Sequence, residues 1–395
     1  MELRMYEYRL YPSGEQQVKI LNQFSVCKDV YNTLLDLNQK LWITNKFRLN
    51  SLVLDIKTTC PEYYTQVHSQ VLQNISDRLA KAFDNFFNRL KLKKQGRKIK
   101  AGFPRFKSRI QSITYPQSGF KFLSNKRLQV SKIDSMPIVL HRLPKGKIKT
   151  LTIKRNNAGQ WFAVFSCEVD IPVVEHPHPE AKIGIDVGLE KFLTDNRGQS
   201  IANPRFYLNA EKKLARLQRI RSKRVKGSKN REKSRIKVAR QHLKVANQRT
   251  DFLHKLTNSL TRDFKIIAGE RLNIQGMVHS NLAKHILDVS WGRFYQMLSY
   301  KAVTCGGELR KNPKTRGSSK RCSGCGAEVD MPLRKRTFKC PECGFVCHRD
   351  KNSAINHLND TDGLSGISTP VEILPLPSVS RKASRVCESG TICNT

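Results

Sequence analysis

Hydrophobic and polar positions change their period along the chain, and each change predicts a different kind of element. The first twelve residues, MELRMYEYRLYP, alternate as a strand does. From Ser13, a candidate N-cap, to about Leu92, apolar residues recur at i, i+3, i+4 and i+7, which predicts helices. Residues 112–170 then return to short β-type runs separated by Gly and Pro turns. Strand, helices and further strands indicate a β-barrel with a helical insertion.

After a Pro-rich linker at residues 171–181, the segment AKIGIDVGLEKFLTDNRGQSI predicts two strands joined by a turn. Residues 211–240 carry fourteen basic and two acidic side chains at helical spacing, with a bend at Gly227–Ser228. We therefore expect a basic helical hairpin there. The apolar run FKIIAGERL, residues 264–272, predicts another strand.

Two helices are expected further on, one from about Ser290 to Thr304 and a short one that begins near Asp350. Two CxxC pairs occupy residues 322–343 between them. From Asn359 the chain is rich in Ser, Pro and Gly, a composition that favours a disordered tail.

The charge of the chain is far from balanced, with 72 Lys and Arg against 32 Asp and Glu and a formal net charge of +40. Such an excess draws polyanions to the surface, and an enzyme for small metabolites does not require it. No apolar run approaches the roughly 18 residues of a membrane helix, and the N-terminus lacks the apolar stretch of a signal peptide. We therefore expect a cytoplasmic protein with a nucleic-acid partner, without a membrane or a small-molecule substrate.

Three acidic residues far apart in the sequence stand in contexts that suit metal-dependent chemistry. Asp186 lies inside the apolar strand IGIDVGL, where an unpaired carboxylate is costly and usually has a cation or ion-pair partner. Glu270 ends the strand FKIIAGE, where α/β sheets present ligands, and Asp350 begins the helix DKNSAINHL. Carboxylates suit Mg²⁺, and a pair of such ions can drive the hydrolysis of a phosphodiester.

Each acid also has a simpler interpretation. Asp186 could face solvent beside Gly184 and Gly188, or act as the phosphate-loop Asp of an actin-like ATPase, although the further Gly-rich motifs of those enzymes are not visible. Glu270 could be an exposed strand-end residue, and Asp350 could be an N-cap. The order and the contexts of the three acids together favour the metal site.

The chain has 11 cysteines, an odd number that does not indicate a disulfide framework. Four of them form two CxxC pairs separated by 14 residues: Cys322, Cys325, Cys340 and Cys343. This spacing predicts a ribbon with one tetrahedral, structural zinc ion, because protein thiolates fill all four positions. Cys347 and His348 lie near enough to replace a ligand, and four buried thiols without metal are the remaining alternative.

The motifs taken together resemble a known family. GIDVGLEKFLTD, ANQRTDFLHKL, IIAGERLNIQGM, DVSWGRF, SSKRCSGCG, FKCPECG and HRDKNSAINHL are similar to segments of TnpB. TnpB is the RNA-guided nuclease of bacterial insertion sequences and the ancestral type of type V CRISPR effectors. The N-terminal YRLYPSGEQ, AFDNFF and GFPRFKSR fit the same family, so the resemblance covers roughly residues 5–358.

The resemblance implies a multidomain α+β protein. Its parts would be a wedge β-barrel (1–12 and 111–172), an inserted helical recognition domain (13–110), an RNase H-like, RuvC-type α/β nuclease domain (173–316 and 348–358), a zinc-ribbon insertion (317–347) and the disordered tail (359–395). In such a protein a guide RNA pairs with double-stranded target DNA, the protein reads a short adjacent motif, and one RuvC site cleaves the DNA.

The resemblance also assigns roles to the candidate residues. Asp186, Glu270 and Asp350 match the catalytic triad, which would hold two Mg²⁺ or Mn²⁺ ions, and the four cysteines would hold one structural Zn²⁺. His348 departs from the Asp that the family usually has at this position. Because that residue is not a triad member, we expect activity to survive the change.

Candidate nucleic-acid contacts come from the resemblance and from charge. The resemblance places Gln73 and Tyr115 near the region that reads the adjacent motif, although Gln73 could simply belong to a polar helix face. Clusters of basic side chains suit the phosphates of a guide duplex and a target strand. The basic candidates are Arg97, Lys98, Arg105, Lys107, Arg216, Arg221 and Arg224. Phe103 and Phe106 could stack on bases, but core packing is the simpler interpretation.

Three other functions fit parts of the sequence. A guide-directed DNA-binding regulator that does not cleave would be expected to lack one of the three acids, and none is missing. A transposase would be expected to carry further domains. A passive RNA-binding protein with a zinc ribbon would leave Asp186 and Glu270 without a role.

Overall fold

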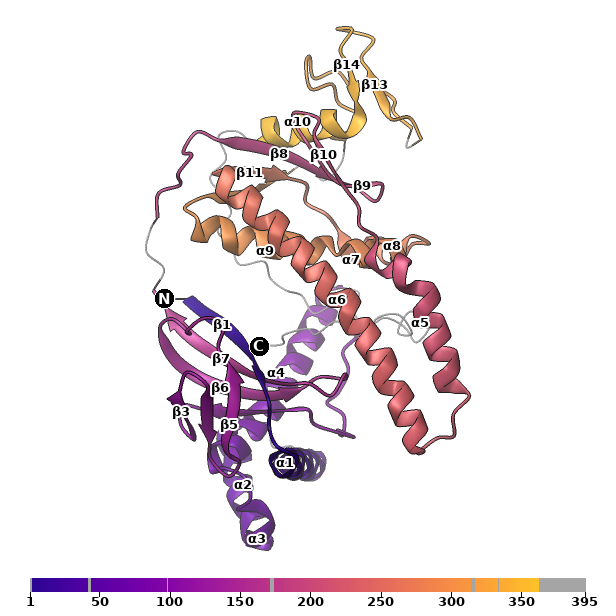
Figure 1. Cartoon of the computed structure of the whole chain (residues 1–395). Coiled ribbons are helices and arrows are strands. Elements are labelled where there is room, and N and C mark those ends of the chain that lie inside the picture. Colours follow the sequence, from indigo (N-terminus) through magenta and orange to yellow (C-terminus); the bar gives the residue numbers. More distant parts are fainter. Residues whose placement is uncertain are drawn as a thin grey trace. The chain divides into compact units, whose positions relative to one another are not determined.

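The computed structural model describes residues 2–41, 44–97, 99–170, 174–313, 317–332 and 334–361. The chain divides into two compact units, Met1–Ile171 and Pro172–Thr395, and each is described by itself (Figure 1). The candidate contact Lys98, the first residues of the expected linker and nearly all of the expected disordered tail lie outside the described residues. No helix in the described ranges has both the length and the apolar character of a membrane span.

The first unit is built on an antiparallel sheet whose hydrogen-bonded order is β2-β6-β7-β1-β5-β4-β3. Its strands are β1 (Glu2–Leu10), β2 (Ser112–Pro116), β3 (Phe120–Ser124), β4 (Arg127–Val130), β5 (Asp134–Val139), β6 (Lys147–Arg155) and β7 (Trp161–Val169). The alternation of the first twelve residues thus predicted a strand correctly, and β1 pairs with β7 along its whole length. The sheet is curled, but among the described residues β2 and β3 remain its edges, so hydrogen bonding does not close it into the expected barrel.

The helices between β1 and β2 are α1 (Gly14–Leu41), α2 (Lys46–Thr59), α3 (Pro61–Tyr64) and α4 (Ser69–Lys94). Ser13 caps α1 as predicted. Its Oγ accepts the Gln16 N–H at 3.2 Å, and the Gln16 side chain accepts the Ser13 N–H at 3.0 Å. Apolar residues of these helices and of the sheet form one hydrophobic cluster. The helical segment and the sheet therefore share a core, and their division into separate domains stays a prediction.

The second unit contains a five-stranded sheet in the order β10-β9-β8-β11-β12. Its strands are β8 (Lys182–Val187), β9 (Lys191–Asp195), β10 (Ser200–Ala202), β11 (Ile266–Gly269) and β12 (Glu308–Lys311). β8, β9 and β10 are antiparallel neighbours, whereas β11 runs parallel to both β8 and β12. The sequence predicted β8, β9 and β11 but not β12, because the segment ELRK is largely charged.

The helices of this unit are α5 (Phe206–Ser222), α6 (Lys229–Asp263), α7 (Ile274–Met277), α8 (Ala283–Val289), α9 (Trp291–Thr304) and α10 (Arg349–Thr361). α5 and α6 form the predicted basic hairpin, and Ser228 caps α6 by accepting the Arg231 N–H at 3.1 Å. The hairpin is longer than predicted, since α6 continues through the buried Leu253 and Leu260 into the core.

Asp288 of α8 fastens this hairpin to the rest of the unit. The buried carboxylate accepts the N–H groups of Tyr207 at 2.9 Å and Leu208 at 3.3 Å, at the start of α5. It also accepts a hydrogen bond from Arg249 of α6 at 2.9 Å. Asp288 therefore accepts backbone N–H groups that have no partner within α5 and also pairs with a cation of the neighbouring helix α6.

Candidate metal centre and nucleic-acid surfaces

The sheet of the second unit brings Asp186 and Glu270 together. Side chains alternate along a strand, and Ile183 and Ile185 of β8 point into the core that contains α9. Asp186 therefore faces the opposite side, where α10 contacts β8 (Figure 1). β11 is in register with β8 so that Gly269 pairs with Ile185. The next residue, Glu270, thus comes opposite Asp186.

One oxygen each from Asp186 and Glu270 and one ring nitrogen of His357 lie within 4.8 Å of one another, a grouping that could hold a metal ion. Burial raises the pKa of Glu270, and the charge of Asp186 raises that pKa further. Two half-buried acids held this close repel each other when both are ionised. A divalent cation would remove that repulsion, and carboxylate oxygens are the ligands that Mg²⁺ prefers, so these residues fit the expected ion.

Asp350 stands at the start of α10 and lies outside that group of three. Burial raises the pKa of Asp350, and the charge of Asp186 raises it further. His348 and Arg336 oppose this shift. The Arg336 Nη1 lies 3.9 Å from Asp350 Oδ1, and the His348 Nδ1 accepts the Asp350 N–H at 3.2 Å.

The sequence did not identify His357, which the structure places in the group instead of Asp350. Its Nε2 lies 3.4 Å from Asp186 Oδ1, and the side chain is fully buried. A signal was present, because His357 follows Asp350 by seven residues, about two helical turns, and so lies on the same side of α10.

The four cysteines of the CxxC pairs also converge, with their sulfur atoms within 4.8 Å of one another. Cys322 Sγ lies 3.6 Å from Cys343 Sγ, and Cys325 Sγ lies 3.6 Å from Cys340 Sγ. Tetrahedral ligation with Zn–S bonds of about 2.3 Å would separate the sulfurs by about 3.8 Å, so the arrangement suits zinc. Among the described residues, Cys347 and His348 are not part of this group.

The ribbon around these thiols consists of two similar turns and a short hairpin, β13 (Thr337–Lys339) with β14 (Val346–His348). The Gly326 N–H donates to Cys322 O at 3.0 Å, and the Gly344 N–H donates to Cys340 O at 3.1 Å. Phe338 is fully buried in the small apolar cluster of the ribbon. Because β14 leads directly into α10, the ribbon and the start of that helix are continuous.

The six basic candidates that the structure describes are accessible to a ligand. Five have exposed side chains and Arg221 is half-buried, the exposed ones being Arg97, Arg105, Lys107, Arg216 and Arg224. Gln73 is exposed on α4. Phe103 packs against Phe83 and Phe86, whereas Phe106 is 53% exposed and free of the core.

The structure does not support a nucleic-acid contact by Tyr115. Its side chain is fully buried, and its hydroxyl group donates to Gln23 Oε1 at 3.1 Å and lies 3.3 Å from Ser131 O. Burial also raises the pKa of Tyr115. A direct contact would require this ring to leave the core of the first unit, so we assign Tyr115 a packing role.

Three family models match the chain. Residues 165–281 match OrfB_IS605, described as "Probable transposase", and residues 291–357 match the "Cas12f1-like, TNB domain". Residues 1–46 match HTH_OrfB_IS605, described as "Helix-turn-helix domain", although in the structure this segment contains β1 and α1.

Two relatives align over nearly the whole chain. A protein of Streptomyces pristinaespiralis named "Putative RNA-guided DNA endonuclease" is 33% identical over 368 residues, which are 90% of this chain and 88% of the relative. InsQ of Escherichia coli (strain K12), which carries the same description, is 29% identical over 381 residues, or 90% of this chain and 92% of the relative.

A solved structure shares the fold. The protein chain in "Cryo-EM structure of the Cas12f1-sgRNA-target DNA complex" superposes with a TM-score of 0.55 at 14% identity, covering 91% of this chain and 99% of that chain. At this identity the likeness concerns the fold alone. The extended identity to the Streptomyces relative, together with the matched models, shows that the chain belongs to the TnpB family.

Proposed function

We propose that this protein is an RNA-guided DNA endonuclease that hydrolyses phosphodiester bonds with divalent metal ions at a RuvC-type, RNase H-like site. The observation that carries the proposal is the pairing of Asp186 and Glu270 on one face of the sheet, against which α10, the helix that begins at Arg349–Asp350, packs. The names of the aligned relatives and the presence of guide RNA and target DNA in the structural neighbour's title support the RNA-guided activity.

Three groups of residues would have different roles in such a reaction. Asp186, Glu270 and Asp350 would hold the ions, which when bound would activate a water molecule and stabilise the leaving oxygen. The four thiolates would hold a structural zinc ion that orders the ribbon next to α10. The exposed cations of the first unit and of the α5–α6 hairpin would neutralise the phosphates of the guide RNA and the target DNA.

Base pairing between guide and target would supply the choice of sequence, and the protein would read the shape of the duplex and a short adjacent motif. Gln73, exposed on α4, is our candidate for the motif contact. The alternative, a guide-directed DNA-binding protein without nuclease activity, has no feature in its favour, because the three acids of the proposed triad are present.

The proposal is tested with the full chain and the RNA that co-purifies with it. Sequencing that RNA gives the guide, and a plasmid that carries the matching target is then incubated with the complex and Mg²⁺. We expect the parent protein to linearise the plasmid and Asp186→Ala to leave it intact while retaining the same RNA. Asp251→Ala, which removes an exposed carboxylate on α6, serves as the matched control and should cleave like the parent.

Two results would count against the proposal. Cleavage by Asp186→Ala at the rate of the parent would remove this acid from the metal site. Specific binding of the target by the parent without any cleavage in Mg²⁺ or Mn²⁺ would favour the non-cleaving alternative.

A further inference from the structure

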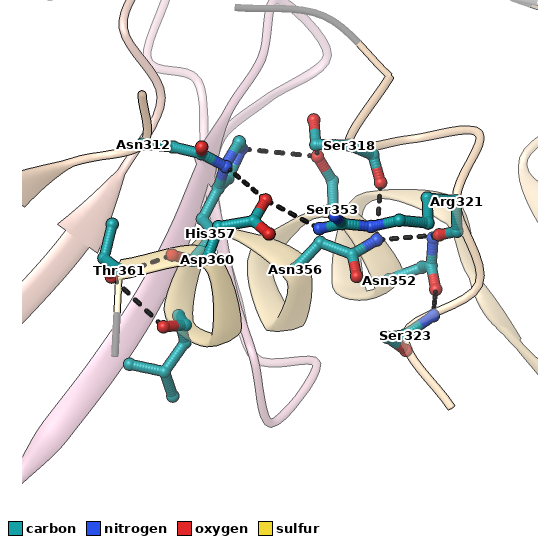
Figure 2. Close-up of polar contacts among 11 residues, drawn as sticks. Asn312, Ser318, Arg321, Ser323, Asn352, Ser353, Asn356, His357, Asp360 and Thr361 are labelled. Carbon is teal, nitrogen blue, oxygen red and sulfur yellow. Dashed lines mark hydrogen bonds and ion pairs between the residues drawn. The ribbon is translucent and has the colours of Figure 1, made fainter. Parts of the chain in front are cut away.

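Polar side chains fill one side of α10, the side on which a helix against a sheet usually carries apolar residues. Asn352, Ser353, Asn356 and His357 are all buried there, and the side chain of Asp360 is only 9% exposed. Buried polar groups are costly unless each finds hydrogen-bond partners. Figure 2 shows that these residues reach partners from two other segments, the end of β12 and the loop that leads into the ribbon.

His357 is at the centre of this network. Asn312, which follows β12, donates from Nδ2 to Asp360 Oδ2 at 2.9 Å, and an ionised carboxylate only accepts. That bond fixes the orientation of the amide, so the same Nδ2 is also the donor toward His357 Nδ1, at 3.1 Å. Nδ1 is therefore the acceptor, and the ring is the tautomer that carries its proton on Nε2.

The Nε2 proton points to the metal site. Nε2 lies 3.4 Å from both Asp186 Oδ1 and Ser353 Oγ, and the Ser353 hydroxyl, which can accept the Nε2 proton, donates to that same Asp186 oxygen at 3.1 Å. Asp186 Oδ1 thus accepts the Ser353 hydroxyl and also lies close to His357 Nε2, one turn further along α10, and the two contacts restrain the orientation of the carboxylate.

The far end of the network reaches the ribbon. Asp360 Oδ2 accepts a hydrogen bond from Arg321 Nη2 at 2.6 Å, and Arg321 immediately precedes the zinc-ligating Cys322. The backbone oxygen of Arg321 accepts the side-chain amides of Asn352 and Asn356, each at 2.7 Å. Figure 2 shows these bonds between α10 and the base of the ribbon. The same helix carries Ser353 and His357, which contact Asp186.

We propose that His357 is a positioning residue for the metal site. As a neutral imidazole it directs Nε2–H toward the hydrogen-bonded pair of Asp186 and Ser353 and so sets the direction in which the carboxylate meets the metal ion. Asn312 and the Asp360–Arg321 pair hold its ring in place. The inference rests on the proposed function, because it assumes that Asp186 binds a divalent cation. Direct ligation by His357 would require its Nε2 to lose the proton and break its contacts with Asp186 and Ser353.

The test measures Mn²⁺ binding to the full-length protein by electron paramagnetic resonance, independently of cleavage. We expect His357→Ala to weaken Mn²⁺ binding about 10- to 100-fold, the usual effect of removing a group that orients a metal ligand. His357→Gln, whose amide can donate to Asp186 from a similar position, should restore most of the affinity. Zinc content should remain at the parent's level in both variants, which would show that the ribbon and its anchor on α10 are folded.

Two outcomes would overturn the proposal. Unchanged Mn²⁺ affinity in His357→Ala would show that Asp186 does not need this donor. A directly coordinated imidazole nitrogen in the pulsed spectrum of the parent, absent in His357→Ala, would make His357 a ligand. Asp186→Ala separates this inference from the proposed function. If that variant binds Mn²⁺ like the parent, the metal site itself is misassigned, whatever the behaviour of the His357 variants.

Discussion

At the scale of single residues, ionisation of Glu270 should destabilise the metal-free protein. Burial and then the charge of Asp186 raise its pKa above the ordinary value of 4.5. The folded protein therefore binds this proton more tightly than the unfolded chain does. The protonated Glu270 stabilises the folded protein fully at pH values below the pKa of this residue in the unfolded chain. That stabilisation is lost as the pH rises through the higher pKa of Glu270 in the folded protein. We expect Glu270→Gln to raise Tm in Mg²⁺-free buffer at about pH 8 by about 2–4 °C, or about 1 kcal/mol.

The same variant should respond differently to acid and to metal. Near pH 4, where the carboxyl group is protonated in both states, the gain in Tm over the parent should shrink. Added Mg²⁺ should raise the Tm of the parent more than that of Glu270→Gln, because a ligand stabilises only the form that binds it. Glu62→Gln, at an exposed position, is the control. An equal gain in that control would show that the stabilisation does not come from the metal site.

Some residues of the site could be predicted from the sequence, and the reason is their contrast with the surroundings. Asp186 interrupts an apolar strand and Glu270 ends one, so each acid stands out at a position where burial makes a charge costly. His357 did not stand out, because one histidine on a polar helix gives no sign that Asn312, forty-five residues earlier, fixes its tautomer. The contact by Tyr115 was implied by the resemblance, and the burial of its ring speaks against it, because a resemblance in sequence does not tell which face of a strand the sheet buries.

At the scale of elements, the contact between β8 and α10 determines whether the acids meet. A Cβ atom on Gly184 would lie 2.0 Å from Ala354 O and 3.0 Å from Leu358 Cβ, so only glycine allows the helix backbone to lie so close to the strand. Gly184→Ala should push α10, with Asp350 and His357, away from Asp186. We expect the variant to lose about 1–3 kcal/mol in urea unfolding and most of its cleavage activity.

Gly292→Ala provides the matched control for this substitution. Gly292 lies within α9, and the nearest atom to its added Cβ would be Ile274 Cδ1 at 3.5 Å, an ordinary contact. Because Gly292 is the second residue of α9 and the added methyl group makes only this ordinary contact, this variant should keep about the stability of the parent and cleave like it. Equal stability of Gly184→Ala and the parent would show that α10 is not packed as closely as described.

The elements that the sequence predicted are those with a strong repeat, and the missed ones lack it. Only the first part of α6 was predicted, from its dense basic charge. The rest of the helix carries the apolar residues that anchor it in the core and lies beyond that basic segment. β12 is held in the sheet by parallel pairing with β11, and the sequence of β12 itself does not predict this pairing. The ribbon was predicted from the spacing of its cysteines, because two CxxC pairs bring four thiolates together in short turns that a zinc ion would order. The attachment of the ribbon to α10 depends on single side chains such as Arg321 and Asn352.

At the scale of the whole molecule, the net charge of +40 is the property that the sequence gives most directly. It predicts a polyanionic partner without reference to any element, and the family membership agrees with that prediction. Charge alone does not distinguish a cation that contacts a phosphate from one that is merely solvated, because both are exposed. A cation that is already paired with a carboxylate is less available to a phosphate, so paired cations can serve as controls for the hairpin arginines.

The salt dependence of RNA binding should identify the cations that contact phosphates. Each such contact releases counterions and adds about 0.7–0.9 to the slope of log K against log salt concentration. The hairpin variant Arg216→Ala/Arg221→Ala/Arg224→Ala should therefore bind the co-purifying RNA with a slope reduced by about 2–3. The control removes the same charge from cations already paired with acids, Lys19→Ala/Lys255→Ala/Arg262→Ala, whose partners lie at 2.6, 2.8 and 3.1 Å. If both variants change the slope equally, the excess charge acts as a general field rather than through contacts of the hairpin.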